Sequence, residues 1–316
     1  MPENPSTLTE ISESSARARR RRRLGLSAAA VVAVGAVATT VLLQRPDAAA
    51  GGAGDELVPL TIGDTAQSDF QDAIVEVGRE KGLDLEFVNF DDPYLPNTAL
   101  VNGEVDANSF QHVAWLSQFN RENDADITPL FSTVISSWGL FSEDFADVDD
   151  VPQGARVAVP DDPSNFSRAL FILETAGLIE VDDDAGVFPQ ESDITENDRG
   201  LELVRIAHES VQTAYSDPTV AAVVIATDDF DPSLGITGED ALALEDSAAT
   251  SSSPYAIVLA TTADRVEDPA WELLEETYRD ERVVEALEEE KRGQATIVEL
   301  PVEDLRSTLS ELTEQG

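Results

Sequence analysis

Polar and aromatic side chains are concentrated in residues 106–116, which read DANSFQHVAWL. His112, one of only two histidines in the chain, lies in this segment. The segment's other candidates for ligand contact are two amide and two aromatic side chains: Asn108, Gln111, Phe110 and Trp115. Amide and imidazole groups form hydrogen bonds while rings supply apolar walls, a combination typical of small-molecule sites. The alternative is that the aromatic residues belong to the core and His112 is a satisfied surface residue.

The first half of this segment has no helical period and the second half does. We therefore expect a short strand that ends near Phe110 and a helix that opens near His112. A strand end followed by a helix start is where open α/β sheets hold their ligands. The local pattern is thus compatible with a ligand site and equally with a core segment.

A second candidate for chemistry is Arg168. A strand over Arg156–Val159 precedes it, and a helix is expected over Asn165–Ile179, with Ser164 or Asn165 as its N-cap. This places Arg168 in the first helical turn, where a guanidinium beside the helix N-terminus can hold a carboxylate with two hydrogen bonds. The alternative is an ion pair with one of the many nearby acids.

Strands and helices alternate along most of the chain, which predicts an α/β fold with a mainly parallel sheet and helices on both faces. The further strands expected are Leu57–Ile62, Leu85–Phe90, Leu201–Ile206, Val220–Ile225 and Pro254–Ala260. Leu130–Phe141 is apolar and expected to be extended. The further helices expected are Asp69–Lys81, Asn97–Val101, Pro269–Lys291 and, after a short strand, Val302–Leu312.

Composition limits the function classes. The chain has 316 residues, 63 acidic against 20 basic side chains and a net charge of −43, so we expect no binding to nucleic acid. There is no cysteine, which removes disulfides and thiolate chemistry. No serine-hydrolase elbow, P-loop or zinc-helix motif occurs, and Asp228, Asp229 and Asp231 lack the spacing of a calcium loop. We therefore expect no enzyme activity, no cofactor and no metal site.

The N-terminus has the pattern of an export segment. Residues 1–23 are polar and end in an arginine run, and residues 24–43 are uncharged and long enough to span a bilayer. Because the arginines favour the inner side, the rest of the chain is expected outside the cytoplasm. Residues 24–43 are either a transmembrane anchor or a signal core followed by cleavage near Ala50, and residues 44–56 form a linker.

Three motifs carry a family resemblance: FDDPYLPNTALVNGEVDAN, DANSFQHVAWL and VAVPDDPSNFSRALFILETAGLI. With them, the chain resembles the NlpA-type methionine-binding lipoproteins, which are substrate-binding components of ABC importers. The resemblance implies a periplasmic-binding-protein-like fold with a cleft between two lobes. The implied lobes are residues 57–135 with 250–316, and residues 136–249. It also implies that the lobes close on a small amino acid and that an ABC permease and ATPase are the partners.

The resemblance assigns roles to individual residues. Arg168 would hold the ligand carboxylate, His112, Gln111 and Asn108 would contact polar ligand atoms or line the first lobe, and Phe110 and Trp115 would pack on the ligand side chain. Tyr94 would replace the family's pocket tyrosine, which aligns with Pro93.

The chain also departs from the family. It lacks the lipid-bearing cysteine, and Ala226 and Ile257 stand where the family has asparagines that fix the amino-acid head group. The tail from Ile297 also departs from the family, and the resemblance assigns it no role. Methionine or a related hydrophobic amino acid is therefore the expected ligand. The alternative is an anchored binding or sensor protein with a different carboxylate or peptide ligand and no transport role.

Overall fold

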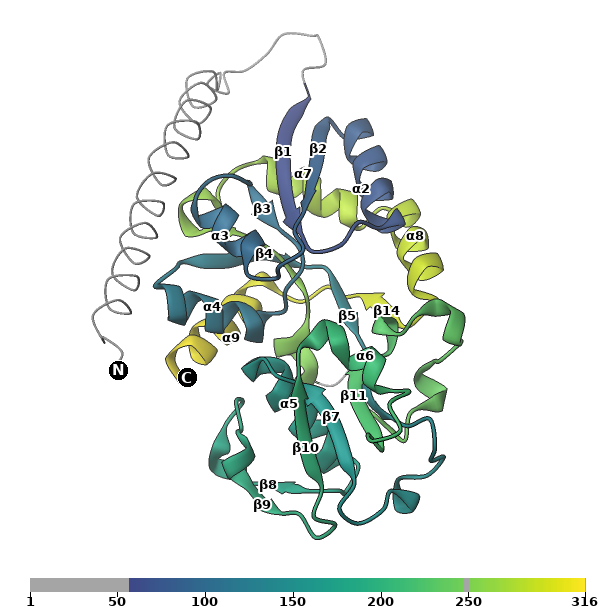
Figure 1. Cartoon of the computed structure of the whole chain (residues 1–316). Coiled ribbons are helices and arrows are strands. Elements are labelled where there is room, and N and C mark those ends of the chain that lie inside the picture. The colour runs from purple at the N-terminus through teal and green to yellow at the C-terminus, as the bar shows by residue number, and fades with distance from the viewer. Residues whose placement is uncertain (1–56, 247–249, 316) are drawn as a thin grey trace, which may run out of the picture. The chain divides into compact units, whose positions relative to one another are not determined.

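The first of two five-stranded sheets has the strand order β2-β1-β3-β13-β4 (Figure 1). The structure, a computed structural model, describes residues 57–246 and 250–315. The strands are β1 (Val58–Asp64), β2 (Leu83–Asn89), β3 (Ala107–Asn108), β4 (Ile127–Ser132) and β13 (Val258–Thr262). β1 is parallel to β2 and β3, whereas β13 is antiparallel to β3 and β4.

Helices cover both faces of this sheet. Neighbouring residues of a strand point to opposite faces, and here both sets are apolar and packed against helices. Leu259 of β13 packs in the same core as α2 and α7, while Val258 and Ala260 pack with α4 and α9. The helices are α2 (Asp69–Glu80), α3 (Leu95–Val101), α4 (Val113–Asn123), α7 (Ala270–Tyr278), α8 (Glu281–Lys291) and α9 (Val302–Gln315).

The second sheet has the order β10-β7-β11-β6-β12. Its strands are β6 (Trp138–Phe141), β7 (Arg156–Pro160), β10 (Glu202–Ile206), β11 (Ala222–Ala226) and β12 (Ala243–Leu244). β7 is parallel to β10 and β11, and β6 is antiparallel to β11 and β12. The helix α5 (Pro163–Thr175) packs on one face of this sheet and the short helix α6 (Val211–Ala214) on the other.

Extended segments connect the two sheets. β4 continues through β5 (Val134–Ser136) into β6, and a 3-10 turn at Thr250–Tyr255 leads into β13. β14 (Ala295–Ile297) pairs antiparallel with β5, and Figure 1 shows this pair between the two sheets. A further hairpin, β8 (Glu180–Val181) with β9 (Ile194–Glu196), belongs to neither sheet.

The structure confirms the α/β alternation and corrects several boundaries. β3 ends at Asn108, two residues before the expected end. The helix expected over Pro269–Lys291 is two helices, because Asp280 leaves the helical conformation and its side chain caps α8 through the Arg282 N–H. The strand expected from Pro254 begins only at Val258.

The expected N-cap of α5 is wrong. Asp162 caps the helix by accepting a hydrogen bond from the Asn165 N–H at 3.0 Å, and Pro163 occupies the first helical position. Proline suits that position because its fixed φ is helical and its missing N–H would be unsatisfied in any case. Arg168 consequently lies in the second turn, so the N-terminal field of the helix does not account for its role.

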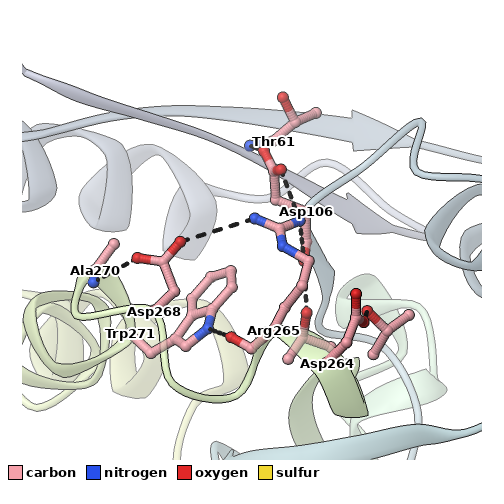
Figure 2. A network of polar contacts seen from close by, with 9 residues as sticks. Thr61, Asp106, Asp264, Arg265, Asp268, Ala270 and Trp271 are labelled. Carbon is pink, nitrogen blue, oxygen red and sulfur yellow. Dashed lines mark hydrogen bonds and ion pairs between the residues drawn. The ribbon is translucent and has the colours of Figure 1, made fainter. Parts of the chain in front are cut away.

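A polar network holds the start of β3 (Figure 2). Asp106 accepts hydrogen bonds from the Thr61 N–H at 2.9 Å and from Arg265 Nη1 at 2.8 Å. Arg265 in turn receives the Trp271 indole N–H on its backbone oxygen at 2.7 Å. Because the charged partners are mostly buried, this network fixes the register of the strand that leads into residues 108–112.

The expectations for residues 1–23, 24–43 and 44–56, and for cleavage near Ala50, lie outside the described residues. Among the residues that the structure does describe, no helix is both long and apolar enough to cross a membrane. For the rest of the chain we propose that each sheet marks one lobe, with the boundaries expected from the sequence: residues 57–135 with 250–316, and residues 136–249.

Candidate functional site

The ends of the parallel strands bring the candidate residues together. β1 and β3 end at Asp64 and Asn108 on one edge of the first sheet. β7, β10 and β11 end on one edge of the second sheet, where β6 begins at Trp138 opposite Ala226. Ligands of open α/β sheets bind beyond such carboxyl ends. Direct contacts between the two edges define the site described below.

Three buried amides lock the loop after β3. Asn97 Nδ2 donates to Gln111 Oε1 at 2.7 Å, and Asn108 Nδ2 donates to Asn97 Oδ1 at 2.7 Å. Gln111 Nε2 donates to Asn97 Oδ1 at 2.6 Å and to Asn108 Oδ1 at 2.9 Å. Since all three side chains are buried, Asn108 and Gln111 use their hydrogen-bonding groups on each other and on Asn97. The structure therefore gives them a role in shaping the loop.

His112 joins the two edges. It caps α4, with Nδ1 accepting the Trp115 N–H at 3.1 Å, so the ring proton lies on Nε2. Nε2 lies 3.0 Å from Asn165 Oδ1, to which it donates. Burial, with the nearby charge of Arg168, lowers the pKa of His112 to about 4. The imidazole is therefore neutral at physiological pH, in the tautomer that both contacts require.

Three aromatic residues form a wall beside this contact. The Trp115 ring lies 5.1 Å from the ring of Tyr94 and 5.5 Å from that of Phe110. Tyr94 is 49% exposed, and the other two are half-buried. Their partly exposed apolar surface is suited to packing against a hydrophobic side chain.

Arg168 is almost completely buried on the second-sheet side. Its Nε donates to Glu245 Oε2 at 3.0 Å, and its Nη2 contacts Glu245 Oε1 and donates to the Ser136 oxygen at 3.0 Å. The guanidinium carbon lies 4.7 Å from the Trp138 ring centre and 4.5 Å from that of Tyr255. The edge of Arg168 that carries Nε and Nη2 is therefore occupied by the chain's own carboxylate.

Two more pairs lie at the ends of the second-sheet strands. Lys291 of α8 contacts Asp228 Oδ2 at 3.1 Å, which joins the two sheets near β5. His208, directly after β10, has Nε2 3.1 Å from Asp229 Oδ2. Two carboxylates of the acidic turn after β11 therefore pair with basic side chains.

Two surface hollows, of about 860 and 450 Å³, lie away from these residues. The larger is lined by acidic residues around β8 and β9 and the smaller by residues around Lys81 and Arg279. Neither is lined by an expected site residue. The two sheet edges instead meet through direct side-chain contacts.

The structure groups the seven expected site residues in three places: Asn108 and Gln111 in the amide cluster, Tyr94, Phe110 and Trp115 in the aromatic wall, and His112 and Arg168 near Tyr255. Sequence reasoning missed Asn97, Glu245 and Tyr255 as their partners. Glu245 gave no signal, because it is one of many acids. Among residues 57–246 and 250–315, no group of three or more histidine or acidic side chains is placed to hold a metal ion.

Comparison with known proteins gives consistent matches. The family model described as NlpA lipoprotein matches residues 60–298. The D-methionine-binding lipoprotein MetQ of Salmonella typhimurium is 32% identical over 223 residues, which cover 70% of this chain and 80% of MetQ.

Two solved structures extend the comparison. One, a nutrient binding protein from Burkholderia cenocepacia bound to methionine, has a TM-score of 0.68 and 32% identity, and covers 75% of this chain and 99% of that one. The other, the substrate binding protein of a methionine transporter from Streptococcus pneumoniae, has a TM-score of 0.68 and 28% identity, and covers 76% of this chain and 95% of that one.

Proposed function

The chain belongs to the NlpA lipoprotein family, and on that premise we propose that it is the extracytoplasmic substrate-binding protein of an ABC importer. Its ligand is methionine or a related hydrophobic amino acid, bound between the carboxyl edges of the two sheets. The names of its relatives support this ligand class and the transport role. A binding protein of this kind acts by closing on its ligand and presenting the closed form to a permease. It carries out no reaction.

The observation that carries the proposal is the hydrogen bond of His112 to Asn165, 3.0 Å across the two sheet edges. It joins the segment after β3 to the N-terminal turn of α5, the two places where a small ligand would be enclosed. The aromatic wall of Tyr94, Phe110 and Trp115 lies beside it and suits the side chain of methionine. Arg168 is the cationic side chain beside this contact and would meet the ligand carboxylate.

The permease and ATPase of an importer are the proposed partners, reached from the outer face of the membrane. Residues 24–43 either anchor the protein there or are removed with cleavage near Ala50. A lipid anchor on cysteine, as in the lipoproteins that give the family its name, has no attachment site because the chain has no cysteine.

A thermal-shift screen of the full chain against the common amino acids, with both enantiomers of methionine, tests the proposal. A ligand at one hundred times its dissociation constant adds about 2.7 kcal/mol to the free energy of unfolding, which raises the melting temperature clearly. We expect methionine to give one of the largest shifts. Equal, small shifts for all amino acids would contradict the proposed ligand class.

One observation favours the second candidate function, a sensor or binding protein with a different ligand. Glu245 already occupies two donors of Arg168, which leaves less of the guanidinium for an amino-acid carboxylate. Stimulation of ATP hydrolysis by a permease–ATPase complex encoded with this chain separates the two functions. Methionine-dependent stimulation supports transport, and binding without any stimulation supports the sensor.

A further inference from the structure

The imidazole of His208 has a hydrogen-bonding position without a partner. His208 opens the 3-10 turn His208–Ser210 directly after β10. Its Nδ1 is buried and makes no hydrogen bond to any residue in the described part of the chain. Buried ring nitrogens are nearly always satisfied in native proteins, and those that are not call for a missing water, ion or ligand. Its other nitrogen, Nε2, lies 3.1 Å from Asp229 Oδ2.

His208 lies where the proposed ligand site needs contacts from the second sheet. It follows β10, Asp229 follows β11, and Asp162 follows β7, so all three are on the carboxyl edge of parallel strands. The His208 ring lies 5.5 Å from the ring of Trp138, and Trp138 also packs on Arg168. The unpartnered nitrogen is therefore close to the site already described.

The charges nearby favour a cationic group over an anionic one. The charge of Arg168 is balanced by Glu245, and that of Lys291 by Asp228. Asp228 is 9% exposed at its side chain, yet its Oδ1 is buried and has no hydrogen-bond partner among the described residues. Unused acceptors are thus in excess of donors at this edge. An ammonium group would satisfy them, whereas a second carboxylate would add repulsion.

We propose that His208 and Asp229 form the subsite for the ammonium group of the ligand. Nε2 faces Asp229 Oδ2, which raises the pKa of His208 in the free protein. The positive charge of a bound ammonium favours the neutral imidazole with its proton on Nε2, and the lone pair of Nδ1 then accepts a hydrogen bond from the ammonium. The Asp229 carboxylate balances the ammonium charge, and the indole face of Trp138 adds a favourable cation–π contact. Asp229 is a positioning residue in this arrangement, since it sets the tautomer of His208. The inference rests on the proposed function, because it takes the ligand to be a free amino acid.

Calorimetry with two ligands that differ only in the amino group tests this subsite. The full chain is titrated with L-methionine and with 4-(methylthio)butanoate, which keeps the carboxylate and thioether and lacks the amino group. The variants are His208→Phe, which keeps a ring against Trp138, and Asp229→Asn. Glu209→Gln, a charge change on the exposed neighbour of His208, is the matched control. Melting curves establish that each variant is folded.

We expect each site variant to weaken L-methionine binding about tenfold or more, as for loss of one buried hydrogen bond to a charged group. Binding of the deamino ligand should change by less than about threefold. Glu209→Gln should leave both affinities near the wild-type values. Equal losses for both ligands would mean that His208 acts only on the fold, and unchanged affinity in both variants would place the amino group elsewhere. Either result overturns the subsite and leaves the proposed function standing. Failure of the wild type to bind L-methionine overturns both.

Discussion

Arg168 and Glu245, which are 77 residues apart in the chain, meet as a two-bonded ion pair beside the contact between the sheets. Their side chains are 3% and 13% exposed, so neither charge is well solvated alone. Glu245 Oε1 also accepts the Trp138 N–H at 3.0 Å. The pair therefore fixes the start of β6 as well as the guanidinium that the sequence assigned to the ligand carboxylate.

Replacement of Arg168 by methionine should cost about 3–5 kcal/mol of unfolding free energy, because it leaves Glu245 buried without its counter-charge. The double variant Arg168→Met with Glu245→Gln should recover part of this loss, because residue 245 then carries no buried, unpaired negative charge. Urea unfolding of the wild type, both single variants and the double variant measures the coupling. Losses that simply add would show that the pair contributes little to the fold.

Replacement of Asn97 by leucine should destabilise the protein by about 3 kcal/mol. The new side chain is apolar and of similar volume, but Asn108 and Gln111 lose hydrogen bonds that no water reaches. Asn102→Leu, on the exposed C-terminal cap of the same helix, is the control and should change stability little. Denaturant midpoints measure both. An equal loss of stability in the two variants would mean that the hydrogen bonds of the amide cluster do not contribute measurably to the free energy of unfolding.

The low pKa of His112 predicts a pH effect on stability. The unfolded chain protonates His112 near pH 6.5 and the folded chain only near pH 4, so the unfolded state binds more protons between these values. The contribution is complete above pH 6.5 and is lost as the pH falls toward 4, by up to about 3 kcal/mol.

His112→Asn isolates this effect because asparagine can still cap α4 but does not titrate. Asp64, whose pKa burial raises to about 6, changes stability in the opposite direction over the same range, but equally in both proteins. Unfolding free energies at pH 7.5, 6, 5 and 4 should show the wild type losing its advantage over the variant. A constant difference across the series would contradict the buried, neutral imidazole.

The C-terminal helix α9 lies beyond the part of the chain that matches the family and should still be required for stability. Leu309 is buried in the core that α9 shares with α4. Leu309→Ala should cost about 2–5 kcal/mol. Ser310→Ala, on the exposed side of the same turn, should be near neutral. Thermal melts compare the two, and equal melting temperatures would mean that α9 is dispensable.

Local patterns were sufficient for much of the fold. The period of α2 and its Ser68 cap are encoded within neighbouring residues, and α9 was predicted although no family pattern covers it. The break between α7 and α8 was missed, although Asp280 is a good capping residue, because the apolar period continues across it. Boundaries of this kind depend on one or two residues, whose preference tertiary contacts can override.

The partners of the candidate site residues could not be predicted. Asn97 and Gln111 are 14 residues apart and Arg168 and Glu245 are 77 apart, and no local period links them. The resemblance directed attention to Arg168, but the acid that pairs with it was hidden among 63 acidic residues. His208 did carry a signal, as one of two histidines and at a strand end, and only the structure shows its unpartnered nitrogen.

Calorimetric titration of the wild-type full chain with L-methionine tests the central claim, that the contacts between the two sheet edges enclose an amino-acid site. We expect saturable binding with one methionine per chain, and we expect Arg168→Met to weaken this binding about tenfold or more under conditions in which the variant remains folded. If neither L- nor D-methionine gives a saturable binding heat, although the protein melts cooperatively, the proposed amino-acid site is contradicted.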